Sequence, residues 1–435
     1  MIQNGRITIN EREAKTYITM LLIFYPVYMS SLAGFFMPNV MYMLLQMAGV
    51  GLFFLFYGKT LRISKSKVWA YGYAAIMCLF ILYGYAIYPY TGLIVYCAII
   101  LLFLAGMNSD TWQRPVMNII IVASIVYAVS TIVLIFPGTA FYSEHIASLY
   151  PNNYGGLVGC YKRGEYAGIT GHYSTNAAMM VNGLIPIVSI LFVKIKTKES
   201  EKLKATIVIA VLLFCVLILT GKRAHFLFVL CAVLVGWFFY QSNEKNRFLK
   251  ILLIIGGLLF LGLIAYAAIP AVNNLISRFS NMSDDTSVLT RYGLWEAALK
   301  GFSERPIFGN GWTHFANSIG PSIGYTAGPV HNIYVQLLCE TGVVGTAVFV
   351  SFFVFMLILT VRQVRFIAHH KREVPRNTQI LLLFSLLYQT YFLIYGMTGN
   401  PLYDIYEYAV YFTACSIPMF YSGRRSLMLQ KTVSR

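Results

Sequence analysis

Residues 334–361, YVQLLCETGVVGTAVFVSFFVFMLILTV, form an apolar run that contains one acidic residue, Glu340, and no basic residue. A helix of roughly 20 such residues crosses the hydrocarbon core of a bilayer. Only helices or closed barrels satisfy the backbone polar groups there, and a run this continuous predicts a helix. Similar runs recur along the chain, so the sequence predicts an all-α, polytopic membrane protein.

The composition agrees with this prediction. Of the 435 residues, 58% are hydrophobic and only 11% are charged, and the mean hydropathy is +0.66, which is too apolar for a soluble domain. We expect one integral membrane domain over residues 1–435, without an internal repeat of the kind found in many transporters. About twelve spans of the required length are predicted: 17–36, 39–57, 68–87, 92–107, 116–136, 174–193, 205–220, 224–240, 251–269, 334–361, 378–396 and 405–421.

The basic residues predict the orientation of the spans. Most of the 33 lysines and arginines lie in the two terminal segments and in alternate loops, and short positively charged loops stay on the cytoplasmic side. Both termini are therefore predicted to be cytoplasmic. The net charge of +17 is mostly this topology signal, because a nucleic-acid surface would need clustered basic residues interleaved with aromatic ones. No nucleic-acid partner is predicted.

A few basic residues fall on the opposite, outer side, and they need another explanation. They are Lys162, Arg163, Lys222, Arg223, Arg278, Arg291, Lys300 and Arg305. Long outer loops tolerate basic residues, because the topology rule is strong only for short loops, and this is the simpler reading for Arg278, Lys300 and Arg305.

Two outer loops are long enough to carry a site. The first, residues 137–173, is rich in glycine and tyrosine, and the second spans 270–332. Within the second, apolar residues recur at helical spacing between Asp284-Asp285 and Pro306, which predicts a short amphipathic helix. These residues are Leu289, Tyr292, Trp295, Leu299 and Phe302. The simplest role for this stripe is to lie on the bundle or in the lipid interface.

His331 closes the second loop, where the water boundary meets the next span. Its usual pKa near 6.5 suits a general base at neutral pH, although a hydrogen-bonding role at the start of the helix is the alternative. Asn332 and Glu340 follow His331 and are predicted to be supporting residues. An acid within a span, such as Glu340, usually has a partner or a function, although Glu340 could instead only orient the helices. Asp404 and Glu407, at the last outer turn, are expected to be solvated.

Arg163, Lys222, Arg223 and Arg291 are the candidate cations for binding a diphosphate. Arginine binds phosphate oxygens in a bidentate manner, and glycine-rich backbone lies close to several of these residues. The alternative is that their side chains snorkel to lipid phosphates. The seven cysteines suggest neither a disulfide framework nor a metal-binding cluster, and no cofactor is predicted.

Together these motifs resemble the O-antigen ligase and polymerase superfamily of bacterial envelope enzymes. The resemblance rests on Arg163 with the stretch Gly171–Asn176, on Lys222-Arg223, on the helix that carries Arg291 and Trp295 and ends in Arg305-Pro306-Ile307-Phe308-Gly309-Asn310-Gly311, and on His331-Asn332 followed by Glu340-Thr341-Gly342. It is strongest between residues 160 and 350. The stretch Gly171–Asn176 lacks the proline that often precedes its asparagine in the family, which weakens the placement of Arg163.

The resemblance implies an inverting glycosyltransferase that uses neither a metal nor a nucleotide sugar. It implies a donor glycan on undecaprenyl diphosphate, transferred to a hydroxyl at the outer face of the bacterial cytoplasmic membrane. Arg163 and Arg223 would then hold the diphosphate, and His331 would activate the acceptor hydroxyl or orient the reacting groups. The surroundings would be membrane lipid, and the partners a chain-length regulator and a flippase of the same pathway.

Three functions follow from this sequence. The leading hypothesis is a polymerase for capsule, exopolysaccharide or O-antigen chains, which transfers the growing glycan to the next lipid-linked repeat unit. A ligase of the same family, which moves finished glycan to lipid A core, cell wall or protein, is the first alternative. A flippase for lipid-linked sugars is the alternative of another class, although the grouping of the outer cations on one side argues against alternating access.

Overall fold

The computed structural model describes residues 2–3, 6–7, 11–29, 32, 39–57, 67–88, 92–107, 111–197, 203–241, 246, 286–325, 328–422 and 428. The predicted span 251–269, the residues Arg278, Asp284 and Asp285, and most of the first half of the second outer loop lie outside these ranges. Nearly all of the described residues are helical, as predicted, apart from connecting turns and one short antiparallel pair, β1 (Ile2–Gln3) and β2 (Arg6–Ile7).

The described residues contain the following helices in chain order. Their bounds are α1 Glu11–Ile23, α2 Tyr25–Met29, α4 Asn39–Tyr57, α5 Val68–Ile87, α6 Gly92–Gly106, α7 Gln113–Ile135, α8 Gly138–His145, η4 Ala147–Leu149, η5 Pro151–Asn153, α9 Tyr154–Lys162, α10 Tyr173–Thr197, α11 Leu203–Leu219, α12 Arg223–Tyr240, α15 Thr286–Glu304, η7 Phe315–Ile319, α16 Gly320–Ser322, α17 Ile333–His369, α18 Arg376–Tyr395 and α19 Ile405–Tyr421.

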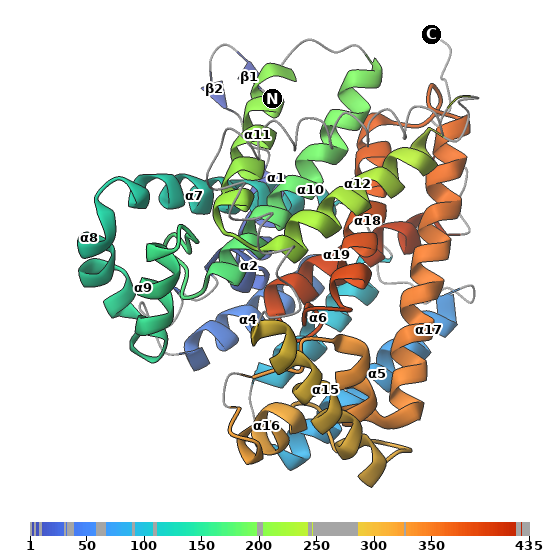
Figure 1. Cartoon of the computed structure of the whole chain (residues 1–435). Coiled ribbons are helices and arrows are strands. Elements are labelled where there is room, and N and C mark those ends of the chain that lie inside the picture. Colours follow the sequence, from blue (N-terminus) through green and yellow to red (C-terminus); the bar gives the residue numbers. More distant parts are fainter. Residues whose placement is uncertain are drawn as a thin grey trace.

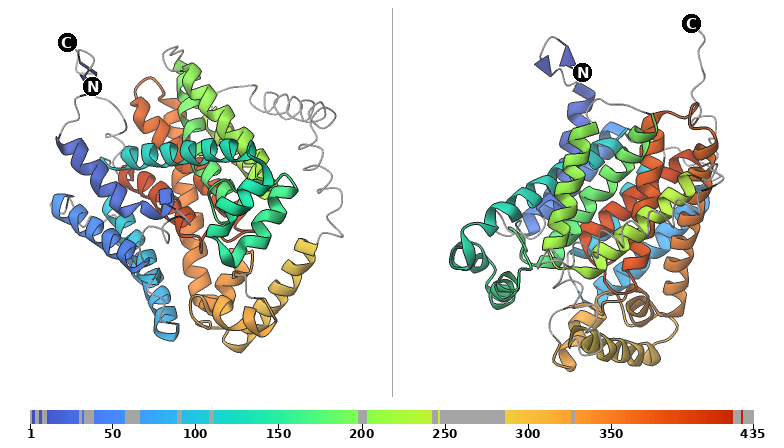
Figure 2. Two further views of the ribbon diagram at one scale, coloured as in Figure 1. Left: turned by 90° about the vertical axis from the view of Figure 1, so that its left-hand side faces the viewer. Right: turned by 45° about the horizontal axis from the view of Figure 1, so that its top comes forward.

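The centre of the bundle is formed by α18 and α19, whose side chains are buried along almost the whole length of both helices. Around them pack α6, α10, α12 and α17. Figure 1 shows β1 and β2 at one end of the bundle and α15 and α16 at the opposite end, and the two further views in Figure 2 agree. The segment between α15 and α17 therefore covers the end of the helices that lies opposite β1 and β2.

Six helices are long and apolar enough to cross a membrane: α5, α7, α10, α12, α17 and α18. Shorter apolar helices cover 40–56, 94–104 and 203–219. These findings confirm a multi-pass helical membrane protein, whereas the count of twelve spans and the cytoplasmic termini stay predictions. The predicted span 17–36 is divided instead, because α1 ends at Ile23 and α2 begins at Tyr25, next to Pro26, whose ring cannot continue an existing helix.

The helix α17 has a break that defines where the outer loop meets the membrane. Gly342 has φ +62° and ψ −169°, which is not helical. A side chain at this position would meet the backbone of Ile307 and Gly309, so the close approach requires glycine. The break separates an outer segment, 333–341, from the long apolar segment 343–369. Glu340 thus lies just outside the long segment and is packed under the outer loop.

The first outer loop is more regular than its glycine content suggests. Residues 138–162 form α8, two 3₁₀ turns and α9, and Figure 1 shows them as a lobe beside the bundle. The second loop contains α15, which ends at Glu304 before Pro306, as predicted. Its packed face is formed by Leu294 and Ala298, which are buried against α17. The predicted stripe is largely exposed at Leu289, Tyr292 and Leu299, so of its two expected places the bundle surface does not apply to these residues.

Candidate active site

His331 lies in the segment that precedes α17, with a φ of +61°. Non-glycine residues rarely adopt this left-handed region, and such strain persists only where the surrounding structure imposes it. Nε2 of its imidazole lies 3.2 Å from the hydroxyl of Tyr325, and Nδ1 lies 3.2 Å from Nδ2 of Asn400. The ring is therefore held between the outer loop and the turn that precedes α19.

Asn400 controls which ring nitrogen of His331 carries the proton. In the arrangement described, Nδ2 can only donate, so Nδ1 accepts and the proton of the neutral ring lies on Nε2. Oδ1 of Asn400 is buried and has no hydrogen-bond partner within the described residues. A half-turn of the amide presents Oδ1 to Nδ1–H and leaves Nε2 able to accept a proton. Sequence reasoning did not single out this residue.

Positive charge surrounds His331. Burial, together with Arg291 and Lys222, lowers the pKa of His331 to about 4. Burial, Lys222 and His331 likewise lower the pKa of His172 to about 4. These four residues come from separate parts of the chain, so folding brings three of the predicted site residues, Lys222, Arg291 and His331, into one electrostatic cluster. The ring of His331 is consequently neutral at pH 7. Its pKa of about 4 lies well below the value near 6.5 that we expected from the sequence.

Lys222 occupies the N-cap position of α12, and no side chain caps this helix end. The preceding Gly221 has φ +68°, which gives the tight turn after α11. Nζ of Lys222 lies 4.2 Å from the ring centroid of Tyr173. Arg223 begins α12, but Lys222 is the residue of this pair whose charge acts on His331. The N-terminus of α12 adds the positive end of a helix dipole at the same place.

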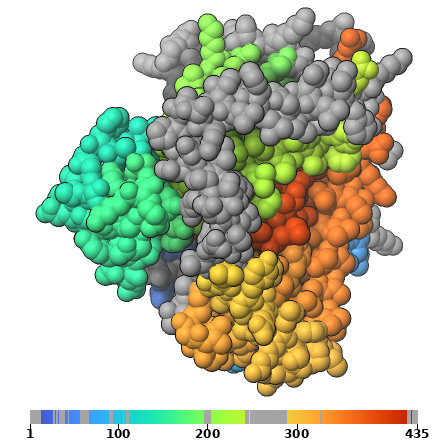
Figure 3. Space-filling view, viewed as in Figure 1, coloured from blue at the N-terminus to red at the C-terminus, as the bar shows by residue number. Residues whose placement is uncertain are grey.

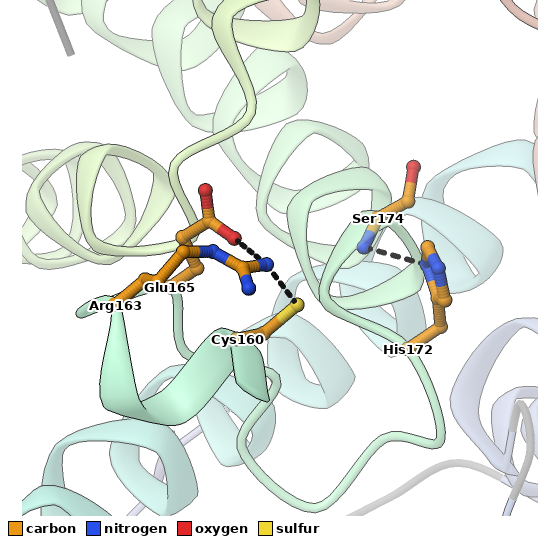
Figure 4. A network of polar contacts seen from close by, with 5 residues as sticks. All are labelled: Cys160, Arg163, Glu165, His172 and Ser174. Atoms are coloured by element: carbon orange, nitrogen blue, oxygen red, sulfur yellow. Dashed lines mark hydrogen bonds and ion pairs between the residues drawn. The ribbon is translucent and has the colours of Figure 1, made fainter. Parts of the chain in front are cut away.

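Arg163 has different neighbours. Its Nη2 lies 2.9 Å from Oε2 of Glu165 and 3.1 Å from Sγ of Cys160, as Figure 4 shows. The side chain of Arg163 is 60% exposed, whereas that of Glu165 is 7% exposed. The backbone N–H of Tyr166 donates to the carbonyl of Leu219, which attaches this segment to the turn before α12. Arg163 is therefore paired with a carboxylate beside the cluster.

His172 was not predicted as a site residue. Its Nδ1 accepts a hydrogen bond from the backbone N–H of Ser174 at 3.1 Å, and its ring stacks on Tyr173 with centroids 4.6 Å apart. Because Nδ1 is an acceptor, the neutral ring carries its proton on Nε2 and can donate there. The sequence signal was a histidine directly after Gly171, within a stretch already singled out by the family resemblance.

Asn332 and Glu340 have supporting roles in the geometry. The side chain of Asn332 caps α17 by accepting from the N–H groups of Tyr334 and Val335, as its residue type favours. Glu340 is fully buried and accepts hydrogen bonds from the N–H groups of Thr313 and Phe315 at 2.9 and 3.2 Å. It therefore anchors the outer loop to the helix that follows His331.

Glu407 corrects one prediction. The sequence suggested a solvated carboxylate, but Glu407 is fully buried. Its Oε1 accepts from the hydroxyl of Tyr391 at 2.8 Å, and that hydroxyl lies 2.6 Å from Nδ1 of His225. Asp404, three residues earlier, is half-buried, and burial raises the pKa of its carboxyl. The helix periodicity turns Glu407 inward among tyrosines, which a reading of the loop alone did not reveal.

Residues 208–350 match the family model described as O-antigen ligase. The resemblance to the O-antigen ligase and polymerase superfamily is thereby confirmed. No curated protein matches the chain. The matched segment contains the three residues of the cluster, Lys222, Arg291 and His331. Arg163 precedes the matched segment in the sequence. In Figure 3 the C-terminal part of the chain, in red, is visible at the surface between α12 and α15.

Proposed function

We propose that this protein is a polysaccharide polymerase of the bacterial cytoplasmic membrane that acts at the outer face. It transfers a glycan from undecaprenyl diphosphate to a hydroxyl of the next lipid-linked repeat unit. The observation that carries the proposal is the cluster of His331, Lys222 and Arg291 at one end of a membrane bundle. All three residues lie in the segment that matches the O-antigen ligase family, whose members act on lipid-linked oligosaccharides.

The cations suit the donor. A diphosphate leaving group gains negative charge as the bond to the anomeric carbon breaks, and preorganised positive groups stabilise such charge most strongly. Lys222 and Arg291 supply two cations, and the uncapped N-terminus of α12 supplies backbone N–H groups for phosphate oxygens. Because diphosphate is a good leaving group, these interactions are the main electrostatic requirement of the reaction.

His331 suits the acceptor. In the proposed step, the acceptor oxygen bonds to the anomeric carbon while the bond from this carbon to the phosphate oxygen breaks, and the electron pair leaves with undecaprenyl diphosphate. With the amide of Asn400 turned so that its Oδ1 accepts from Nδ1–H of His331, Nε2 is free to accept, and the proton of the acceptor hydroxyl passes to Nε2 and then to water. Attack opposite the leaving group inverts the anomeric configuration. His331 is neutral at pH 7 because of its lowered pKa, so it is able to accept this proton.

A ligase is the second candidate function. Its specific support is that the matching family model is described as O-antigen ligase. In this alternative the same cluster transfers a finished glycan to lipid A core, cell wall or another acceptor. The two functions share the donor and the chemistry and differ only in the acceptor.

The test uses purified protein in detergent with undecaprenyl-diphosphate repeat units, without nucleotide and with a chelator present. A ladder of glycan chain lengths supports a metal-independent polymerase, and linkage analysis checks inversion. Conversion only after a second acceptor glycan is added supports the ligase. Unchanged substrate under both conditions, together with movement of lipid-linked sugar across vesicles, contradicts the proposal and favours a flippase.

A further inference from the structure

We propose that α15 and the turn that follows it form a membrane-interface patch, seated on the outer lipid surface beside the site. The patch consists of Tyr292, Leu299, Ile307 and Phe308, which are exposed, and is bordered by Trp295, which is partly buried. This inference does not depend on the proposed reaction, because it concerns where the outer loop lies in the bilayer.

The first support is the exposed apolar side of α15. Tyr292 is 60% exposed and Leu299 is 46% exposed, and the rings of Tyr292 and Trp295 are in contact with centroids 5.6 Å apart. Residues spaced by three and four positions share one face of a helix, so these three side chains lie together. The bundle occupies another face, where Leu294 and Ala298 are buried.

The second support is the polar face beside this apolar side. Glu296, Lys300 and Glu304 recur every four residues and are exposed. The helix therefore has three sides: one packed on α17, one apolar and exposed, and one charged. A helix that lies in the membrane interface has this combination of an apolar flank and a charged flank.

The third support is continuity with the lipid-facing surface of α17. Ile307 and Phe308 are 61% and 60% exposed. The carbonyl of Ile307 accepts a hydrogen bond from the N–H of Val344 at 3.2 Å, and Val343 and Val344 are themselves 54% and 40% exposed. The patch thus adjoins the start of the long apolar segment 343–369, where the bilayer surface begins.

The occupant that fits this surface is therefore a lipid bilayer. A second copy of the chain would have to cover the charged face together with the apolar side, whereas a bilayer interface accommodates both. Arg305 and Lys300 are exposed next to the patch and match the negative phosphates of lipid headgroups. The assignment also explains why Lys300 and Arg305, which have no role in the proposed site, are basic.

The patch has a consequence for the site. Arg291 lies one residue before Tyr292 on α15 and acts on His331. If α15 rests in the interface, Arg291 is held at the depth of lipid phosphates, where a lipid-linked diphosphate would lie. The donor would then reach the cluster sideways from the outer leaflet, past α15.

The test places single spin labels in a variant whose seven cysteines are replaced, reconstituted in vesicles of phosphatidylethanolamine and phosphatidylglycerol. Labels at Leu299→Cys and Phe308→Cys should collide with oxygen dissolved in the lipid more than with a water-soluble nickel chelate. Labels at the matched control positions, Glu296→Cys and Glu304→Cys, should show the reverse preference.

Two outcomes would overturn the proposal. Equal access of the nickel chelate to all four positions would place α15 in water. Protection of Leu299→Cys and Phe308→Cys from both reagents, with dipolar coupling between labels, would identify a second copy of the chain as the occupant. Labels at lipid depth in a protein that makes no glycan ladder would support the patch while contradicting the proposed function, so the two failures are distinguishable.

Discussion

Arg163 and Lys222 are both outer basic residues, yet their surroundings differ. Arg163 forms an ion pair with Glu165 and remains largely exposed. Lys222 lies at the start of α12 and, together with Arg291, influences His331. Two cations close to a neutral histidine raise the positive potential there, which favours an anionic ligand. From this difference we propose that the reaction is centred on the His331 side.

The largest effect is expected from His331→Ala. A positioned general base contributes about 10²- to 10⁴-fold to the rate, so kcat for glycan elongation should fall at least about 100-fold. His145→Ala, which removes an exposed histidine of α8, is the matched control and should leave kcat unchanged. Full activity of His331→Ala in the purified enzyme would remove this residue from the mechanism.

Lys222→Ala and Arg291→Ala should each reduce kcat/KM for the lipid-linked donor by about 10- to 100-fold, because each removes one charge near the developing negative charge of the leaving group. The control is Lys162→Ala, which deletes an exposed cation on the Arg163 side. Steady-state kinetics with varied donor concentration measure the effect. Equal losses in all three variants would show that general surface charge, rather than the cluster, is responsible.

Asn400→Asp should change the pH dependence of the reaction. In the wild type the pKa of His331 is about 4, so kcat/KM should be nearly constant from about pH 6 to 8. An aspartate beside Nδ1 stabilises the protonated ring and raises its pKa, so the acidic limb should move to higher pH, with a several-fold loss at pH 6. Asn317→Asp, an exposed substitution in the outer loop, is the control. An unchanged profile would contradict the role assigned to Asn400.

The smallest effect is expected on the Arg163 side. Arg163 is largely exposed, so water partly screens its ion pair with the buried Glu165, and we expect Arg163→Ala and Glu165→Gln to change kcat/KM by less than about threefold. A loss from Arg163→Ala as large as that from Lys222→Ala would overturn the comparison and place Arg163 among the diphosphate ligands. Thermal unfolding in detergent provides the accompanying check that both variants are folded.

Much of the fold was predictable because the apolar runs repeat at membrane length. The runs at 68–87, 224–240 and 334–361 correspond to α5, α12 and α17. The break of α17 at Gly342 was not predictable, because it depends on the close approach of Ile307 from the preceding loop. The lobe of α8 and α9 was also missed, since its glycines and tyrosines read as an irregular loop.

The candidate site was predictable in part. Arg163, Lys222, Arg223, Arg291 and His331 were recognised by their residue types at an outer boundary and by a family resemblance. Their grouping was not predictable, because Lys222, Arg291, Asn400 and His331 are separated by tens of residues along the chain. The roles of Asn400 and His172 depend on which ring nitrogen accepts a hydrogen bond, which no sequence pattern specifies.

Hydropathy and charge act locally along the chain, so the sequence alone indicated a helical, multi-pass membrane protein, and its motifs resembled the O-antigen ligase family whose model matches residues 208–350. The pairing of Arg163 with Glu165, the burial of Glu407 and the influence of Lys222 and Arg291 on His331 became visible only in the folded chain. Burial and electrostatic interaction depend on distances between segments remote in sequence, and packing of the bundle sets those distances.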